Sequence, residues 1–169
     1  MRLWHKDLIP CLPRQQLLAQ WRECCCIARN IAAKGSPNHV LVNKILDYPL
    51  SHFVNYTLLV YHEMVHRQYK VQWSRFIYHF PLYYPESVEH GEIFFDWHST
   101  RYLRQCYYNL QEKADCGAIP PDEWERIELE WRKEIHYEPI IESQQPENHD
   151  KHIEPQGVDF DNIEEATEI

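Results

Sequence analysis

The chain has 169 residues, of which 44% are hydrophobic and 14% aromatic. This length and composition suffice for one buried core and predict a single folded domain. No run of apolar residues is long enough to span a membrane, and Arg2, His5 and Lys6 interrupt the start too early for a secretory signal. We therefore expect a cytoplasmic protein that has no membrane partner.

The formal net charge of −9 originates in the C-terminal part of the chain. Residues 137–169 contain ten acidic residues against Lys151, which gives this segment alone a net charge of −9. Residues 1–80 contain ten Lys and Arg against four acidic residues, a net charge of +6. A basic N-terminal half is compatible with contacts to nucleic-acid phosphates but does not by itself establish them.

The first predicted helix runs from Gln15 to Lys34 and ends at Gly35. Its apolar residues recur at three- and four-residue spacing and should form the buried stripe: Leu17, Trp21, Cys24, Ala28 and Ile31. Its polar side presents Gln15, Arg22 and Arg29 at seven-residue spacing, with Gln16, Gln20 and Glu23 beside them. This polar side is a candidate ligand-binding surface.

The clearest helical period in the chain spans about residues 50–69. Its apolar positions fall within one stripe of the helical wheel: Leu50, Phe53, Val54, Thr57, Leu58, Tyr61, Met64 and Val65. We expect this helix to form the core of the fold. A short helix that starts at Ser36-Pro37 should precede it and contain Val40, Leu41 and Ile45.

The remaining segments complete an all-α prediction. Residues 71–97 are aromatic and interrupted by proline, without a steady period, and predict a long ordered loop. Two more helices should follow, one that starts around 96–100 and stops at Gly117, and one that starts at Pro120-Pro121. A compact helical domain is thus expected over residues 1–137, and a disordered acidic tail over residues 138–169.

Residues 62–66 read His-Glu-Met-Val-His and match the H-E-x-x-H pattern. In zinc hydrolases this spacing puts two imidazoles on one helix face, with the glutamate as general base. His62 and His66 are therefore the candidate ligands of an alternative function, a zinc-dependent hydrolase. On the helical wheel both lie beside Asn55 and Leu59, away from the centre of the apolar stripe, and the spacing selects no third ligand. We favour the interpretation that they are surface histidines.

Three stretches share residues and spacing with a known family: Arg2 beside the chain start, the helix segment from Gln15 to Glu23, and the segment from Glu63 to Val71. They resemble the pyrimidine-dimer DNA glycosylase (endonuclease V) family over about residues 1–71, and more loosely over residues 98–117. The aromatic loop and acidic tail resemble additions of a bacterial branch. The resemblance implies a compact all-α monomer that removes ultraviolet-induced pyrimidine dimers from double-stranded DNA and nicks the abasic site without any cofactor. Such an enzyme would act at the nucleoid.

The resemblance also implies a role for individual residues. Met1 would supply a nucleophilic α-amine and Glu23 the essential carboxylate, and the residues that bind DNA would be Arg2, Gln15, Arg22 and Arg29. A free α-amine titrates near about 7.7 to 8, so roughly a tenth of it is unprotonated at pH 7, against less than about a thousandth of a lysine amine. A terminal amine is therefore the easier nucleophile for a Schiff base.

Two points remain open at this level. Arg2 disfavours removal of the initiator, so we expect Met1 to be retained; if it is removed, Arg2 supplies the amine. A non-catalytic helical module is a further alternative, and it predicts salt-dependent DNA binding without strand cleavage.

Overall fold

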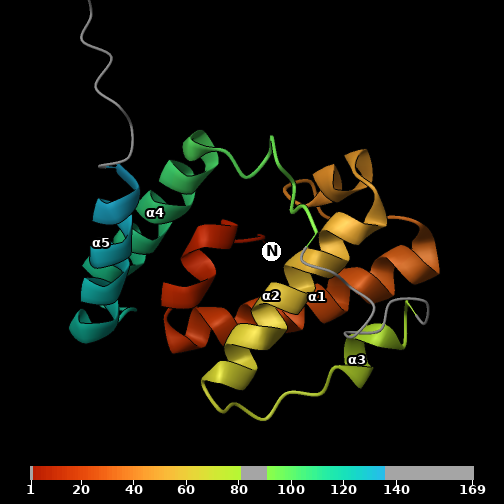
Figure 1. The fold of residues 1–169 in the computed structure, drawn as a ribbon, viewed down its shortest axis with the longest axis horizontal. Helices are drawn as coiled ribbons and strands as arrows, with labels where there is room; N and C mark the ends of the chain where they lie inside the picture. The colour runs from red at the N-terminus through yellow and green to blue at the C-terminus, as the bar shows by residue number, and fades with distance from the viewer. Residues whose placement is uncertain (1, 81–90, 136–169) are drawn as a thin grey trace, which may run out of the picture. The chain divides into compact units, whose positions relative to one another are not determined.

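The computed structural model describes residues 2–80 and 91–135. Within these residues it contains helices and no strand, which confirms the all-α prediction (Figure 1). Met1, residues 81–90 of the aromatic segment and the predicted tail at 138–169 lie outside the described residues. The helices are η1 (Lys6–Cys11), α1 (Arg14–Lys34), η2 (Asn43–Asp47), α2 (Leu50–His66), α3 (Ser74–Ile77), α4 (Thr100–Asp115) and α5 (Pro121–Ile135).

Helix α1 begins and ends much as its sequence predicts. Pro13 precedes its first residue, and the backbone N–H of Arg14 donates to Oε1 of Glu123 on α5 at 2.9 Å. This contact satisfies one of the amide groups that a helix start leaves without an intrahelical partner. At the other end Gly35 adopts a φ of 68°, the left-handed conformation that glycine tolerates best, and its N–H donates to the Ile31 carbonyl.

Helix α2 is buried on more sides than the single predicted stripe. Phe53, Val54, Thr57, Leu58 and Met64 are buried as predicted, and so are three residues outside the stripe: His52, Tyr56 and Val60. Conversely, Leu50 and Tyr61 are only partly buried, and Val65 is 50% exposed. The reason is that α2 packs against α1, η1 and η2 together and so lies in the middle of the described helices (Figure 1).

The region between α1 and α2 departs from prediction. The expected helix from residue 36 is reduced to the 3-10 helix η2, which buries Ile45 and leaves Val40 81% and Leu41 54% exposed. In the sequence, Val40 and Leu41 have the apolar character of core residues, but here they lie in a turn that precedes η2. A positive φ of 62° at Asn38 sets the direction of this turn.

Two short elements were not anticipated. Helix η1 contains Pro10 and has only 6 residues, too few for a helical repeat of apolar residues to be recognised in the sequence. Helix α3, of 4 residues, interrupts the segment that we predicted as a loop, and it buries Phe76.

Helices α4 and α5 lie side by side (Figure 1). Between them the rings of Tyr107 and Trp131 stack with their centroids 4.3 Å apart. Helix α5 also contacts η1, so this pair of helices borders the N-terminal segment. None of the helices in the described part of the chain is long and apolar enough to cross a bilayer.

Candidate active site

The N-terminal segment, Arg2 to Lys6, runs through the interior of the domain. Leu3, Trp4 and His5 are all buried. Residues 2–5 have no regular secondary structure and Lys6 begins η1, so the peptide groups of this segment need partners from elsewhere in the chain. Side chains of three long helices and of His98 supply them.

Helix α1 binds two amide groups of this segment. The backbone nitrogen of Arg2 donates to Oε2 of Glu23 at 3.0 Å, and that of Trp4 donates to Oε1 of Gln20 at 3.1 Å. Gln20 is 1% exposed, although the sequence assigns it to the polar side of α1. Its burial is explained by this hydrogen bond to a neighbouring backbone group.

Helices α2 and α4 bind the carbonyl groups. The hydroxyl of Tyr56 on α2 donates to the Trp4 carbonyl at 2.8 Å, and that of Tyr102 on α4 donates to the Leu3 carbonyl at 2.5 Å. Just before α4, Nδ1 of His98 accepts the backbone N–H of Lys6 at 3.0 Å. The start of the chain is thus fixed from several directions by residues far away in sequence.

The side chains that hold the segment are neutral at physiological pH. Burial lowers the pKa of His98 to about 2, and neighbouring His5, whose ring stacks on it at 5.1 Å, adds to this effect. Burial also raises the pKa of the Tyr56 and Tyr102 hydroxyls well above the usual range. The segment is therefore positioned by neutral hydrogen bonds, with Glu23 as the charged partner at its outer end.

A surface cavity of about 660 Å³ opens beside the Arg2–Glu23 contact. We call it the terminal pocket, and its lining consists of Arg2, Trp4, Gln15, Gln16, Leu18, Ala19, Arg22, Glu23, Leu41, Asn109 and Lys113. Four of the candidate residues, Arg2, Gln15, Arg22 and Glu23, thus surround one cavity. Arg29 does not line it; its guanidinium is exposed and lies 3.6 Å from the Cys26 sulfur.

Several lining residues were not expected from the sequence. Asn109 and Lys113 stand four residues apart on α4, a spacing that puts them on one helix face. The sequence shows only this spacing, which does not indicate that Asn109 and Lys113 line a pocket beside α1. Trp4 contributes its ring, over which the Arg2 guanidinium lies at 5.7 Å from the centroid.

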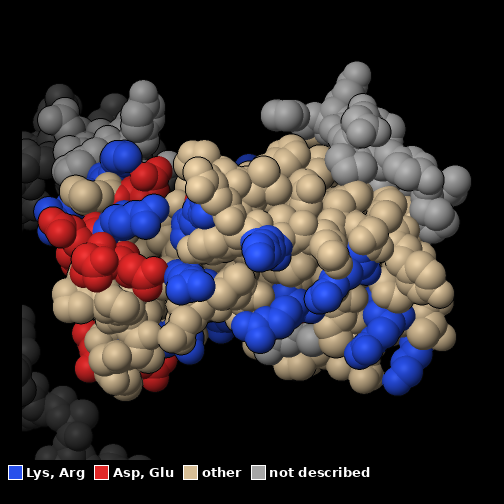
Figure 2. Space-filling view, turned by 90° about the horizontal axis from the view of Figure 1, so that it is seen from below, with Lys and Arg blue, Asp and Glu red and all other residues tan. Residues whose placement is uncertain are grey.

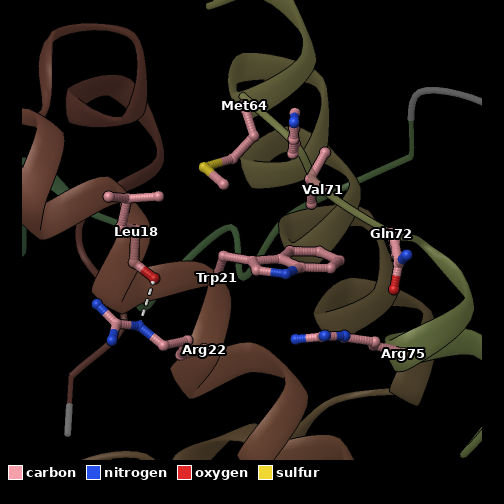
Figure 3. A pocket seen from close by; sticks show the side chains of 8 residues that line it. Leu18, Trp21, Arg22, Met64, Val71, Gln72 and Arg75 are labelled. Carbon is pink, nitrogen blue, oxygen red and sulfur yellow. Dashed lines mark hydrogen bonds between the residues drawn. The ribbon is translucent and has the colours of Figure 1, made fainter. Parts of the chain in front are cut away.

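A second cavity, of about 740 Å³, is also lined by Arg22 (Figure 3). Leu18 and Arg22 line both cavities. In Figure 3 the indole of Trp21 lies between Met64 and Val71 on one side and Arg75 on the other. Lys70 and Arg75 add two exposed cations to this cavity, while Nε of Arg22 donates to the Leu18 carbonyl at 3.2 Å.

These cations belong to a larger basic surface. Figure 2 shows Lys and Arg spread across one face, with Asp and Glu gathered at the end where α5 lies. The exposed cations of α1 and of residues 70–75 are Arg14, Arg22, Arg29, Lys34, Lys70 and Arg75. The +6 charge of the N-terminal half is thus partly concentrated beside the terminal pocket, as a polyanionic ligand would require.

The glutamate of the H-E-x-x-H pattern, Glu63, binds an arginine. Oε1 of Glu63 accepts Nε of Arg67 at 2.5 Å, and the Arg67 guanidinium also donates to the carbonyls of Leu12 and Pro10 at 2.7 and 2.8 Å. Arg67 thereby ties the end of α2 to η1. His62 and His66 are exposed, and within residues 2–80 and 91–135 no group of three His, Cys, Asp or Glu is arranged to hold a metal ion.

The described residues thus form an all-α domain with a cationic pocket beside its own N-terminal peptide. Residues 1–75 match the family model described as pyrimidine dimer DNA glycosylase. The match covers less than half of the chain and agrees with the resemblance seen in residues 1–71 of the sequence. No curated protein and no solved structure matches the chain.

Proposed function

We propose that this protein is a pyrimidine-dimer DNA glycosylase that also cleaves the resulting abasic site, through a Schiff base formed by its N-terminal amine. The observation that supports this proposal best is the 3.0 Å hydrogen bond from the Arg2 nitrogen to the Glu23 carboxylate at the terminal pocket. It puts a carboxylate beside the start of the chain, with Arg22 and Lys113 available for the flanking phosphates.

In the proposed reaction the unprotonated amine attacks C1′ of the 5′ nucleotide of the dimer, and the C1′–base bond breaks as the base leaves with the electron pair. The sugar ring opens to an imine joined to the enzyme. Glu23 stabilises the positive charge that develops at C1′ and then takes a proton from C2′. Loss of the 3′ phosphate breaks the strand, and water hydrolyses the imine to release the enzyme.

Access to C1′ requires a deformed duplex. A nucleotide in a stacked helix hides its sugar and base from a protein pocket, so a base must be extruded or the duplex kinked. A pyrimidine dimer already stacks poorly and lowers this cost. The basic surface of α1 and residues 70–75 would hold the phosphates of the deformed strand (Figure 2).

The test is a borohydride trap. The wild-type protein is incubated with a duplex that contains one pyrimidine dimer, and borohydride is added to reduce the imine to a stable amine. We expect a covalent adduct and a nicked strand, and we expect Glu23→Gln to abolish the nicking. No adduct from the wild type, or full nicking by Glu23→Gln, would refute the proposal. Full activity in the presence of a chelator is expected, and loss of activity would favour the zinc alternative.

The same experiment identifies the nucleophile. We propose that the nucleophile is the α-amine of retained Met1, the residue whose carbonyl carbon forms the peptide bond to the Arg2 nitrogen. Fragmentation of the trapped peptide should therefore find the sugar on Met1. An adduct on Arg2 would mean that Met1 is removed and that the nitrogen in contact with Glu23 is itself the nucleophile. Size-exclusion chromatography with light scattering should give a monomer mass.

A further inference from the structure

The turn before η2 presents two apolar side chains to solvent beside the terminal pocket. Val40 is 81% exposed and Leu41 54% exposed, and Leu41 is one of the residues that line the pocket with Arg2 and Glu23. Isolated exposed apolar residues are common on protein surfaces. Val40 and Leu41, however, are adjacent and lie beside a cationic pocket, so a ligand that enters the pocket can contact them.

This turn is held in place. Nδ1 of His39 accepts the backbone N–H of Leu41 at 3.3 Å, and the His39 carbonyl accepts those of Val42 and Asn43, each at 3.0 Å. Oδ1 of Asn43 accepts the His39 N–H at 3.1 Å.

Both flanks of the turn are anchored to the domain. On one side Nδ2 of Asn30, on α1, donates to the Pro37 carbonyl at 3.1 Å. On the other side Val42 is completely buried. Val40 and Leu41 therefore project from a fixed support, and ordering them costs little when a ligand arrives.

We propose that Val40 and Leu41 form a wedge that inserts into the base stack of duplex DNA at the lesion. This inference rests on the proposed function and extends it to how the enzyme opens its substrate. When the sugar of the damaged nucleotide reaches the terminal pocket, extrusion or kinking leaves a gap between base pairs next to Leu41. Apolar side chains commonly fill such gaps in kinked duplexes.

The charges around the turn fit this occupant. Lys44 is exposed three residues after Leu41, with its Nζ 6.0 Å from the centroid of the Trp97 ring, and Arg2 lies in the pocket that Leu41 lines. A duplex that put its bases against Val40 and Leu41 would bring its negatively charged backbone toward these cations.

The test uses the double variant Val40→Ser with Leu41→Ser and two substrates. One is a duplex that contains a pyrimidine dimer with 2-aminopurine in the adjacent base pair, whose fluorescence rises when it unstacks. The other is a single-stranded abasic oligonucleotide, which needs no opening. The control is Leu129→Ser, since Leu129 is 53% exposed, as Leu41 is, and lies on α5 outside the pocket.

We expect the double variant to lose about tenfold or more of the rate on the dimer duplex, together with the fluorescence rise, because a base-stacking contact usually changes an equilibrium by about one order of magnitude. Trapping on the single strand should fall much less than the rate on the duplex, because Leu41 lines the pocket but no base stack has to be opened. Both substrates should stay within about twofold of wild type with Leu129→Ser.

The remaining outcomes are distinguishable. A wild-type rate on the duplex, or an equal loss on both substrates, would overturn the wedge. Failure of the wild type on both substrates would instead overturn the proposed function.

Discussion

Replacement of Gln20 by Met tests whether the buried hydrogen bonds position the N-terminal segment. Methionine has a similar length, so the change removes the acceptor of the Trp4 N–H, 3.1 Å away, without opening a large cavity. Within residues 2–80 and 91–135, the Gln20 side chain makes one other hydrogen bond, a weak 3.8 Å interaction with the Cys24 sulfur. A buried amide left without an acceptor costs about 1–3 kcal/mol, and we expect the free energy of unfolding to fall by that amount.

The effect on the reaction should exceed the effect on stability. The Trp4 N–H can recover a partner only if the segment moves, and a displacement of about 1 Å of a reacting group lowers a rate by roughly a hundredfold. We therefore expect Gln20→Met to slow borohydride trapping on the single-stranded abasic substrate at least about tenfold under conditions where circular dichroism shows it folded.

A matched control lies one turn earlier on the same helix. Oε1 of Gln16 is buried and has no hydrogen-bond partner among the residues that the structure describes, so Gln16→Met should leave the free energy of unfolding unchanged or slightly increased. Urea denaturation of the two variants provides the comparison. If Gln20→Met unfolds within about 0.5 kcal/mol of wild type and traps at the wild-type rate, then the hydrogen bond to Trp4 does not position the terminus.

Three further changes test other contacts. Lowering the pH from 7 to 5 should reduce the free energy of unfolding by about 2 kcal/mol through His98 alone. The reason is that the unfolded imidazole gains a proton below about pH 6.5, whereas the folded one, with its lowered pKa, does not. Urea denaturation at both pH values should show that His98→Gln removes this contribution to the pH dependence. Arg67→Met should lower the free energy of unfolding by about 2–4 kcal/mol, since it leaves Glu63 and the carbonyls of Leu12 and Pro10 without their donor. The control is Arg29→Met at an exposed position, which should change the free energy of unfolding by less than about 0.5 kcal/mol. Arg22→Gln should reduce the slope of log affinity against log salt by about one in fluorescence anisotropy with duplex DNA, and an unchanged slope would exclude a phosphate contact.

The sequence predicts the long helices well because each combines a steady period with a clear stop. Helix α1 ends before Gly35 as expected, and α4 ends close to Gly117. The predicted stripe on α2 was too narrow, since an amphipathic pattern assumes one buried face and α2 is packed on several. For Val40 and Leu41 the apolar character suggested a helix, but turn geometry placed both at the surface.

The residues of the candidate site likewise fall into those that the sequence could predict and those that it could not. Arg2, Gln15, Arg22 and Glu23 could be selected because the chain start and one helix face are visible in the sequence. The partners of the N-terminal segment could not be, since Gln20 was assigned to the polar side of its helix and neither Tyr56 nor Tyr102 was singled out by any pattern. What distinguishes them is a hydrogen bond to a backbone group up to 99 residues away, and no local pattern encodes such a contact.

The way the N-terminal segment is held also bears on when the protein becomes reactive. Lys6 and Leu3 are bound by His98 and Tyr102, which lie 92 and 99 residues further along the chain and are therefore synthesised later. Under the proposed chemistry, a nascent or incomplete chain carries the amine without the geometry that makes it selective. Under this proposal, chemical competence arrives only when His98 and α4 have folded against the N-terminal segment.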